Sequence, residues 1–115
     1  MVTGGEHSIP TISTHVLDTE RGVPAVGVRV ALYRLGVGEA PIRMTQALTD
    51  GDGRIRDLLE RPLVAGEYRL EFAIAHEDGS FFTRIAVDLA ITDTERSYHV
   101  PLLLAPYSMT TYRGT

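Results

Sequence analysis

Regular alternation of apolar and polar residues, broken by turns at short intervals, is the feature that most limits how this chain can fold. From Tyr68 to Ile74, apolar side chains alternate with polar or smaller ones, and the runs 28–33 and 84–91 repeat the pattern. Such alternation is typical of strands that turn one face to a core. Gly, Pro and Asp separate the runs about every 8 to 12 residues. The pattern predicts antiparallel β-structure.

These runs predict an all-β, two-sheet antiparallel sandwich, because eight short strands in 115 residues fit one domain of that architecture. The expected strands lie near residues 12–18, 26–35, 41–48, 53–57, 67–75, 81–91, 97–104 and 107–113. Only the segment 56–61 offers a short helical turn, which Pro62 would end. We expect residues 1–10 to be a flexible N-terminal lead and residues 11–115 to form the domain.

Composition excludes several classes of protein. The formal net charge of -4 argues against nucleic-acid binding. Without Cys there is no disulfide, thiolate nucleophile or Cys-based zinc site, and without Lys there is no Schiff base. No run reaches the roughly 18 apolar residues of a membrane span, and the first ten residues do not resemble a secretory signal. We expect a cytoplasmic protein that binds neither nucleic acid nor membranes.

Two of the expected strands carry apolar residues on both faces. In the run 97–104, His99, Pro101 and Leu103 lie opposite the core series. In the run 12–18, His15 has the corresponding place among residues opposite the core. A strand that is apolar on both sides is covered on both sides, yet a small sandwich has one core. We favour a second subunit as the cover; a locally covered strand or an exposed apolar patch is the alternative.

Four histidines are candidates for chemistry, and their positions separate them. His7 in the lead and His76 in a turn are expected to be exposed and without function. His15 and His99 lie in mid-strand, where a single histidine is more often structural than catalytic. If their faces line one cleft, however, two imidazoles meet where protons can be exchanged near neutral pH. Arg54, taken alone, reads as an exposed arginine after a turn.

No metal site is expected from these residues. His15 and His99 lack a third ligand at a telling spacing. The Asp-rich turn 49–53 is too short for a calcium loop and lacks the terminal bidentate Glu.

Five motifs together resemble the 5-hydroxyisourate hydrolases, the enzymatic relatives of transthyretin, from about residue 11 to the end of the chain. They are STHVLD at 13–18, TDGDGR at 49–54, GEYRL at 66–70, YHVPLLLAP at 98–106 and YRGT at 112–115. The THVLD, HVPLLL and YRG pieces carry the specificity, because many prealbumin-like modules share the middle motifs.

The resemblance implies a transthyretin-like sandwich that forms a homotetramer, with active sites at the interface between dimers. His15, Arg54 and His99 match the family's catalytic trio, and Tyr112 and Thr115 match the aromatic and hydroxyl residues of its terminal tetrapeptide. The implied reaction hydrolyses 5-hydroxyisourate to 2-oxo-4-hydroxy-4-carboxy-5-ureidoimidazoline in urate and purine degradation. No metal or cofactor is implied.

Residue chemistry fits this reaction, because opening a cyclic amide needs a base for water, donors for the oxyanion and an acid for the leaving nitrogen. We expect one of His15 and His99 to activate water while the other shuttles protons. Arg54, with His15 and Tyr112, would bind the substrate, and Arg54 would also stabilise the oxyanion. Thr115 would orient the water or a histidine.

The chain departs from the family pattern in two places. Thr115 stands where Ser is usual, which keeps the hydroxyl but restricts its rotamers. A tight turn at 75–80 and the residues 82–84 replace a longer segment with a short helix. These changes leave open an enzyme for a different cyclic amide or lactam. A non-enzymatic transthyretin-like ligand-binding protein and a structural module of a surface protein are further alternatives, which the set His15, Arg54, His99 and Tyr112 disfavours.

Overall fold

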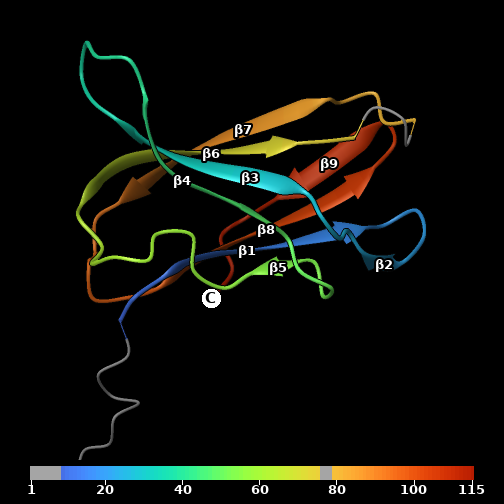
Figure 1. Cartoon of the computed structure of the whole chain (residues 1–115), viewed down its shortest axis with the longest axis horizontal. Coiled ribbons are helices and arrows are strands. Elements are labelled where there is room, and N and C mark those ends of the chain that lie inside the picture. Colours follow the sequence, from blue (N-terminus) through green and yellow to red (C-terminus); the bar gives the residue numbers. More distant parts are fainter. Residues whose placement is uncertain (1–8, 76–78) are drawn as a thin grey trace, which may run out of the picture.

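Two β-sheets packed face to face make up the structure, a computed structural model that describes residues 9–75 and 79–115 (Figure 1). The first sheet, called sheet A here, contains β1 (Ile12–Asp18), β2 (Val23–Pro24), β5 (Arg54–Ile55), β8 (Tyr98–Ala105) and β9 (Ser108–Thr111). Sheet B contains β3 (Arg29–Leu35), β4 (Ile42–Leu48), β6 (Gly66–Ala73) and β7 (Arg84–Ile91). The predicted all-β sandwich is therefore confirmed, and none of the described residues forms a helix.

Sheet A has β1 and β8 at its centre and is the sheet that carries the candidate site. β1 pairs with β8 in parallel, with β9 beyond β8 and with β2 and β5 on the other side of β1. The parallel pair departs from the antiparallel prediction. Alternation reports which face of a strand is buried but not its partner, and the chain reaches β8 only after crossing through sheet B.

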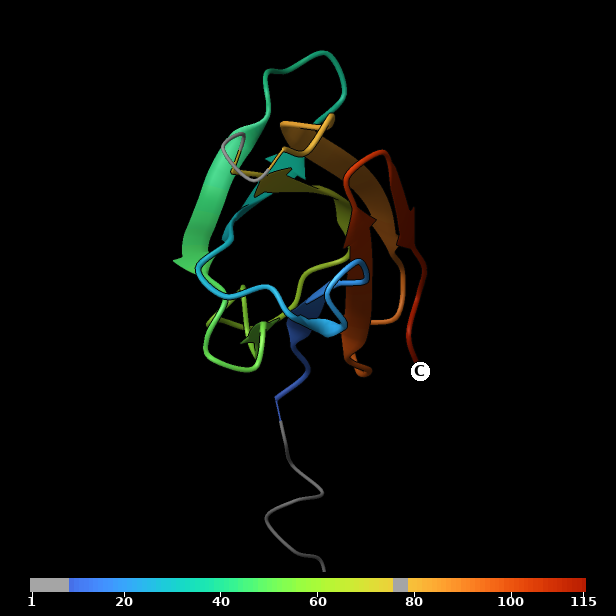
Figure 2. The ribbon, with the colours of Figure 1, turned by 90° about the vertical axis from the view of Figure 1, so that its right-hand side faces the viewer.

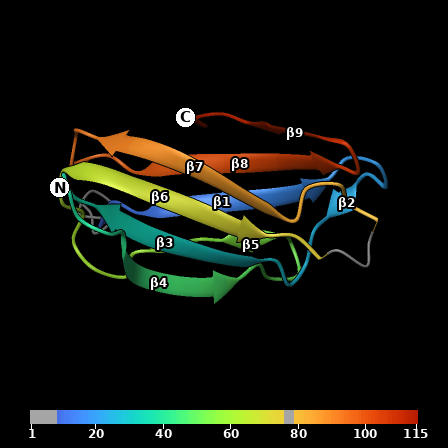
Figure 3. The same ribbon diagram turned by 90° about the horizontal axis from the view of Figure 1, so that it is seen from above.

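Sheet B is antiparallel throughout, in the order β4-β3-β6-β7. Seen end-on, the two sheets curve around a common interior (Figure 2), and from above β9 and β4 lie toward opposite sides of the molecule (Figure 3). No helix among the described residues is long and apolar enough to cross a membrane. The cytoplasmic location stays a prediction.

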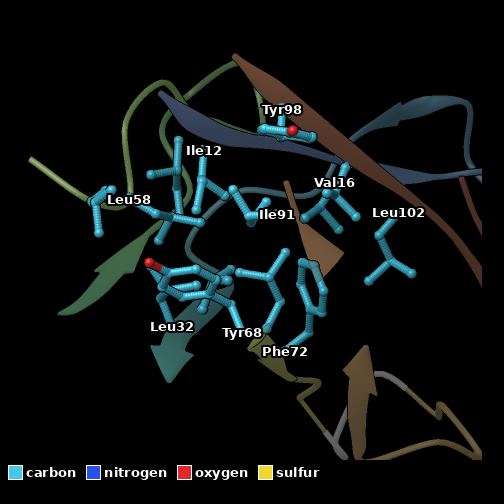
Figure 4. Close-up of a cluster of buried hydrophobic side chains, with 14 of the residues drawn as sticks. Ile12, Val16, Leu32, Leu58, Tyr68, Phe72, Ile91, Tyr98 and Leu102 are labelled. Carbon is cyan, nitrogen blue, oxygen red and sulfur yellow. The ribbon is translucent and has the colours of Figure 1, made fainter. Parts of the chain in front are cut away.

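The core lies between the sheets and uses the inward faces that alternation predicts. On β6, Tyr68, Leu70 and Phe72 are at most 1% exposed, and they oppose residues of sheet A such as Val16 and Leu102 (Figure 4). Each such side chain contributes about 1.5–3 kcal/mol when it leaves water. Because this core is buried, one face of β1 and of β8 points inward, and the alternate residues of both strands project from the outer face of sheet A.

The segment 56–61, the one place where the sequence allows a short helical turn, forms no helix. Leu58 and Leu59 are both buried, and the Leu58 N–H donates to Ile12 O of β1 at 2.8 Å. The Asp57 carboxylate accepts the Leu59 and Glu60 N–H groups, which caps a tight bend. Two consecutive leucines reach the core from an irregular loop, and this tertiary burial overrides the local helical preference.

Several strand boundaries also differ from the prediction. β5 is shorter than expected, β7 starts at Arg84 rather than 81, and the two-residue strand β2 was not predicted. His7 and His76 lie outside the described residues. The boundary between a lead at 1–10 and a domain at 11–115 stays a prediction.

Candidate active site

The outer face of sheet A brings His15, Arg54 and His99 together from three different strands. His15 on β1 pairs directly with Arg54 on β5. On the other side of β1, Ser13 is the register partner of His99 on β8. His15, Arg54 and His99 are all half-buried, and the charges of His15 and Arg54 both act on the pKa of His99. The three predicted residues therefore share one face.

A tight turn before β5 places Arg54. The Asp50 carboxylate accepts the backbone N–H groups of Asp52 and Arg54, both at 2.9 Å. These two hydrogen bonds, the one from Arg54 first, lower the pKa of Asp50. The Asp50 N–H in turn donates to Arg54 O at 2.9 Å. The Asp50 carboxylate thus serves as a local hydrogen-bond acceptor that shapes the entry to β5.

Gly53 allows the turn to lie directly against β1. Its φ is 75°, and a β-carbon at this position would lie 2.5 Å from Val16 O. The Val16 N–H donates to Gly53 O at 2.8 Å. Any larger residue would force the turn away from β1 at the place next to His15.

Contact with a backbone carbonyl determines which nitrogen of His15 carries a proton. His15 Nε2 lies 2.9 Å from Asp52 O. A carbonyl oxygen only accepts hydrogen bonds, so Nε2 is the donor and holds a hydrogen. In neutral His15 the other ring nitrogen, Nδ1, is then unprotonated.

The ring of His99 is held by a different kind of partner. His99 Nδ1 lies 2.9 Å from Ser13 Oγ, a hydroxyl that is able to donate or accept. Burial lowers the pKa of His99 below its ordinary value, and the positive charges of Arg54 and His15 lower it further. His99 is therefore neutral at physiological pH, the state in which an imidazole accepts a proton.

The C-terminal tail lies along β8 beside His99. The Gly114 N–H donates to His99 O at 2.7 Å, in a bridge that continues the register of the β8–β9 pair. In that register Tyr112 lies across from Pro101, and its side chain is 56% exposed. Thr115 is exposed as well. Among residues 9–75 and 79–115, no hydrogen bond joins Tyr112 or Thr115 to His15, Arg54 or His99. The functional roles of Tyr112 and Thr115 therefore stay predictions.

Two cavities, of about 250 and 420 Å³, lie elsewhere on the described surface. The larger lies between β7 and the tail, and its lining includes Arg96, Tyr98 and Tyr112. Neither is lined by His15, Arg54 or His99. Within residues 9–75 and 79–115, no three His, Asp or Glu side chains gather as a metal-ligand set. The half-buried trio thus lies outside these two cavities.

Three contributors to the site were not identified from the sequence: Ser13, the Asp52 carbonyl and Gly114. The two-residue repeat of a strand puts Ser13 on the same face as His15, but it does not show which strand lies beside it. A backbone carbonyl has no side-chain signal, and the close approach of Gly114 to His99 depends on the register between β8 and the tail.

Known proteins resemble this chain in sequence along most of its length. The family model described as the HIUase/transthyretin family matches residues 12–114. The 5-hydroxyisourate hydrolase of Deinococcus radiodurans is 41% identical over 116 residues, covering 92% of this chain and 97% of that protein. The 5-hydroxyisourate hydrolase of Caulobacter vibrioides is 38% identical over 113 residues, covering 90% and 97%.

Solved structures resemble it in fold. The structure of Klebsiella pneumoniae 5-hydroxyisourate hydrolase superposes with a TM-score of 0.80 at 37% identity, covering 93% of this chain and all of that one (100%). Sea bream transthyretin in complex with thyroxine superposes with a TM-score of 0.82 at 27% identity, covering 90% and 94%. The same sandwich thus occurs in a hydrolase and in a protein solved with a bound hormone.

Proposed function

The chain belongs to the HIUase/transthyretin family, and from that premise we propose that it is an enzyme that hydrolyses 5-hydroxyisourate in urate degradation. The observation that carries the proposal is the assembly of His15, Arg54 and His99 on one face of sheet A. The product is 2-oxo-4-hydroxy-4-carboxy-5-ureidoimidazoline.

The reaction assigns one task to each member of the trio. One histidine takes a proton from water as the water oxygen bonds to the amide carbon, and the other handles the proton needed by the ring nitrogen when the carbon–nitrogen bond breaks. Arg54 binds the planar substrate through paired N–H donors and stabilises the charge that develops on the carbonyl oxygen. Tyr112 donates a hydrogen bond to the substrate, and Thr115 orients the water or a histidine.

An enzyme fits this face better than a ligand-binding protein does. An apolar hormone needs an apolar channel, in which a neutral imidazole, a second imidazole and a guanidinium are costly to bury. Hydrolysis needs those same groups. The half-burial of the trio leaves it accessible to a polar substrate.

We also propose that the active form is a homotetramer with active sites between dimers. In support, His99 shares the outer face of sheet A with Leu103, an apolar side chain that the single chain leaves half-buried. The three side chains of the trio are only half-buried, so a second copy packed on this face would enclose them.

The decisive experiment follows the ultraviolet absorbance of 5-hydroxyisourate, freshly made from urate by urate oxidase, with and without this protein. We expect a decay faster than the spontaneous one. His15→Asn or His99→Asn should lower kcat by at least about 100-fold, the scale of general acid–base catalysis, while the assembly stays intact.

A decay no faster than the spontaneous rate would remove 5-hydroxyisourate as the substrate and favour a different cyclic amide. Unchanged kcat in both histidine variants would contradict the assignment of the trio. Sedimentation of each variant serves as the control that assembly is intact.

A further inference from the structure

We propose that Ser13 is a positioning residue that accepts a hydrogen bond from Nδ1–H of His99 and so reserves Nε2 of His99 as the atom that takes the proton from water. The inference rests on the proposed function and deepens it, because it assigns the base to one of the two histidines. The contacts around the imidazole rings of His15 and His99 support this assignment.

The ring of His99 is held at both atoms that adjoin Cγ. Nδ1 lies 2.9 Å from Ser13 Oγ on β1. On the other edge, the tail backbone lies so close that a β-carbon on Gly114 would be 2.7 Å from Cδ2. With Nδ1 and Cδ2 both engaged, the distal edge of the ring, formed by Cε1 and Nε2, projects away from the strand. Among residues 9–75 and 79–115 the ring of His99 has one hydrogen-bond partner, Ser13 at Nδ1, and Nε2 has none.

The ring of His15 is engaged at the opposite end. Its distal Nε2 donates to Asp52 O at 2.9 Å, and only the proximal Nδ1 is left. A nitrogen next to Cγ reaches less far from the strand than Nε2 does. Of the two histidines, His99 thus presents the better placed proton acceptor, and His15 is the one whose outer nitrogen is already used.

The single hydrogen on a neutral imidazole gives the direction of the hydrogen bond between Ser13 and His99. A neutral imidazole has one N–H, so an unprotonated Nε2 requires the hydrogen on Nδ1. Ser13 Oγ accepts a hydrogen bond from this Nδ1–H before the reaction and still accepts it when His99 becomes an imidazolium. Water gives its proton to Nε2 while its oxygen bonds to the amide carbon. A proton then passes from the imidazolium, by way of the other histidine, His15, to the nitrogen that leaves.

The charges that face His99 are consistent with this role. Arg54 on β5 and His15 on β1 both act against a proton on His99, as burial does. The ring is thus kept neutral, and Ser13 decides where its single hydrogen lies.

A direct test reads the tautomer by long-range proton–nitrogen correlation NMR on the full-length protein labelled with nitrogen-15 in histidine. His99 is assigned by the signals lost in His99→Gln. We expect the Nδ1–H form in the parent protein and in Ser13→Thr, which keeps the hydroxyl. Ser13→Ala should change to the Nε2–H form. The Nε2–H form in the parent protein, or an unchanged tautomer in Ser13→Ala, would overturn the proposal.

Kinetics give a second readout. We expect Ser13→Ala to lower kcat about 10- to 100-fold with little change in KM, and Ser13→Thr to restore most of it. Ser97→Ala is the matched control, since Ser97 Oγ accepts the Thr11 N–H at 2.9 Å just before β1 and β8 begin, and its hydrogen bond is to Thr11 rather than to a histidine. An equal loss of kcat in Ser97→Ala, or full activity in Ser13→Ala, would contradict a positioning role.

The two proposals fail in different ways. If the parent protein does not accelerate the decay of 5-hydroxyisourate, the proposed function fails, while the NMR experiment still decides the tautomer. If the parent protein is active but His99 is in the Nε2–H form, only the role of Ser13 and the assignment of the base are lost. Thermal melting identifies a variant that has failed to fold.

Discussion

At the scale of single residues, the chemistry of this face depends on how the environment of His99 sets its protonation. Burial and the positive charges of Arg54 and His15 all lower its pKa. A general base works in its unprotonated form, so activity is lost as the pH falls through the pKa of the base. A lowered pKa therefore extends the active range into mildly acidic solution.

Replacing Arg54 by Gln should move this acidic limit. Without the guanidinium charge, the pKa of His99 rises toward its ordinary value of 6.5. The acidic limb of the kcat profile is then expected at higher pH than in the parent protein, in addition to an overall loss of activity. NMR titration of the His99 ring measures the same shift without substrate. Arg29→Gln on the exposed surface of sheet B is the control, and an acidic limb that stays in place in Arg54→Gln would contradict the prediction.

At the scale of elements, the turn from Asp50 to Arg54 is the part of the structure that joins β5 to β1. Its hydrogen bonds are mostly from backbone to backbone or from backbone to Asp50. It places the Asp52 carbonyl against His15 and Arg54 opposite the same histidine. Disturbing this turn should therefore affect stability and the site together.

Gly53→Ala tests that dependence. Alanine at a φ of 75°, with its β-carbon 2.5 Å from Val16 O, requires the backbone to shift, at an expected cost of more than about 1 kcal/mol in unfolding free energy. Gly51→Ala is a matched control two residues away, where an added β-carbon meets open space and the change should stay within about 0.5 kcal/mol. Urea unfolding measures both. Equal stability of the two variants would mean that the close approach of the turn to β1 is unimportant.

At the scale of the whole molecule, the outer face of sheet A differs from an ordinary solvated surface. Its central strand β8 is buried or half-buried at every residue even in the single chain. On its outer face the half-buried apolar residue Leu103 lies in the same strand as the half-buried His99. This combination supports the proposal that copies of the chain associate through this face and enclose the site.

Leu103→Arg should therefore weaken association and activity together. A charged side chain at the centre of an apolar interface is expensive to desolvate. We expect light scattering to show a smaller species than the parent assembly, which for a tetramer is four times the chain mass of 12.6 kDa. Leu48→Arg, at a position 58% exposed on sheet B, should leave the mass unchanged. A parent-sized assembly of Leu103→Arg would place the interface elsewhere.

Much of the sandwich was predictable because alternation is a local property. The buried series Tyr68, Leu70 and Phe72 follows from the two-residue repeat of a strand, whatever its partner. Strand pairing was not predictable in this way, and the parallel β1–β8 pair is the clearest example. The bend at Leu58 and Leu59 was likewise not predictable from a local pattern, because distant strands decide the burial of these two leucines.

By itself, the sequence determined the fold class, the inward face of each long strand and the identity of His15, Arg54 and His99 as candidates. The fold class, the inward faces and the mid-strand positions of His15 and His99 depend on side-chain type and on spacing along one strand, whereas Arg54 became a candidate through the resemblance to the family's motifs. Only the tertiary structure decided that Ser13 meets His99, that the Asp52 carbonyl meets His15 and that Gly114 lies against the His99 ring. Those contacts join residues far apart in the chain. They depend on register and on backbone approach, for which an amino-acid pattern carries no signal.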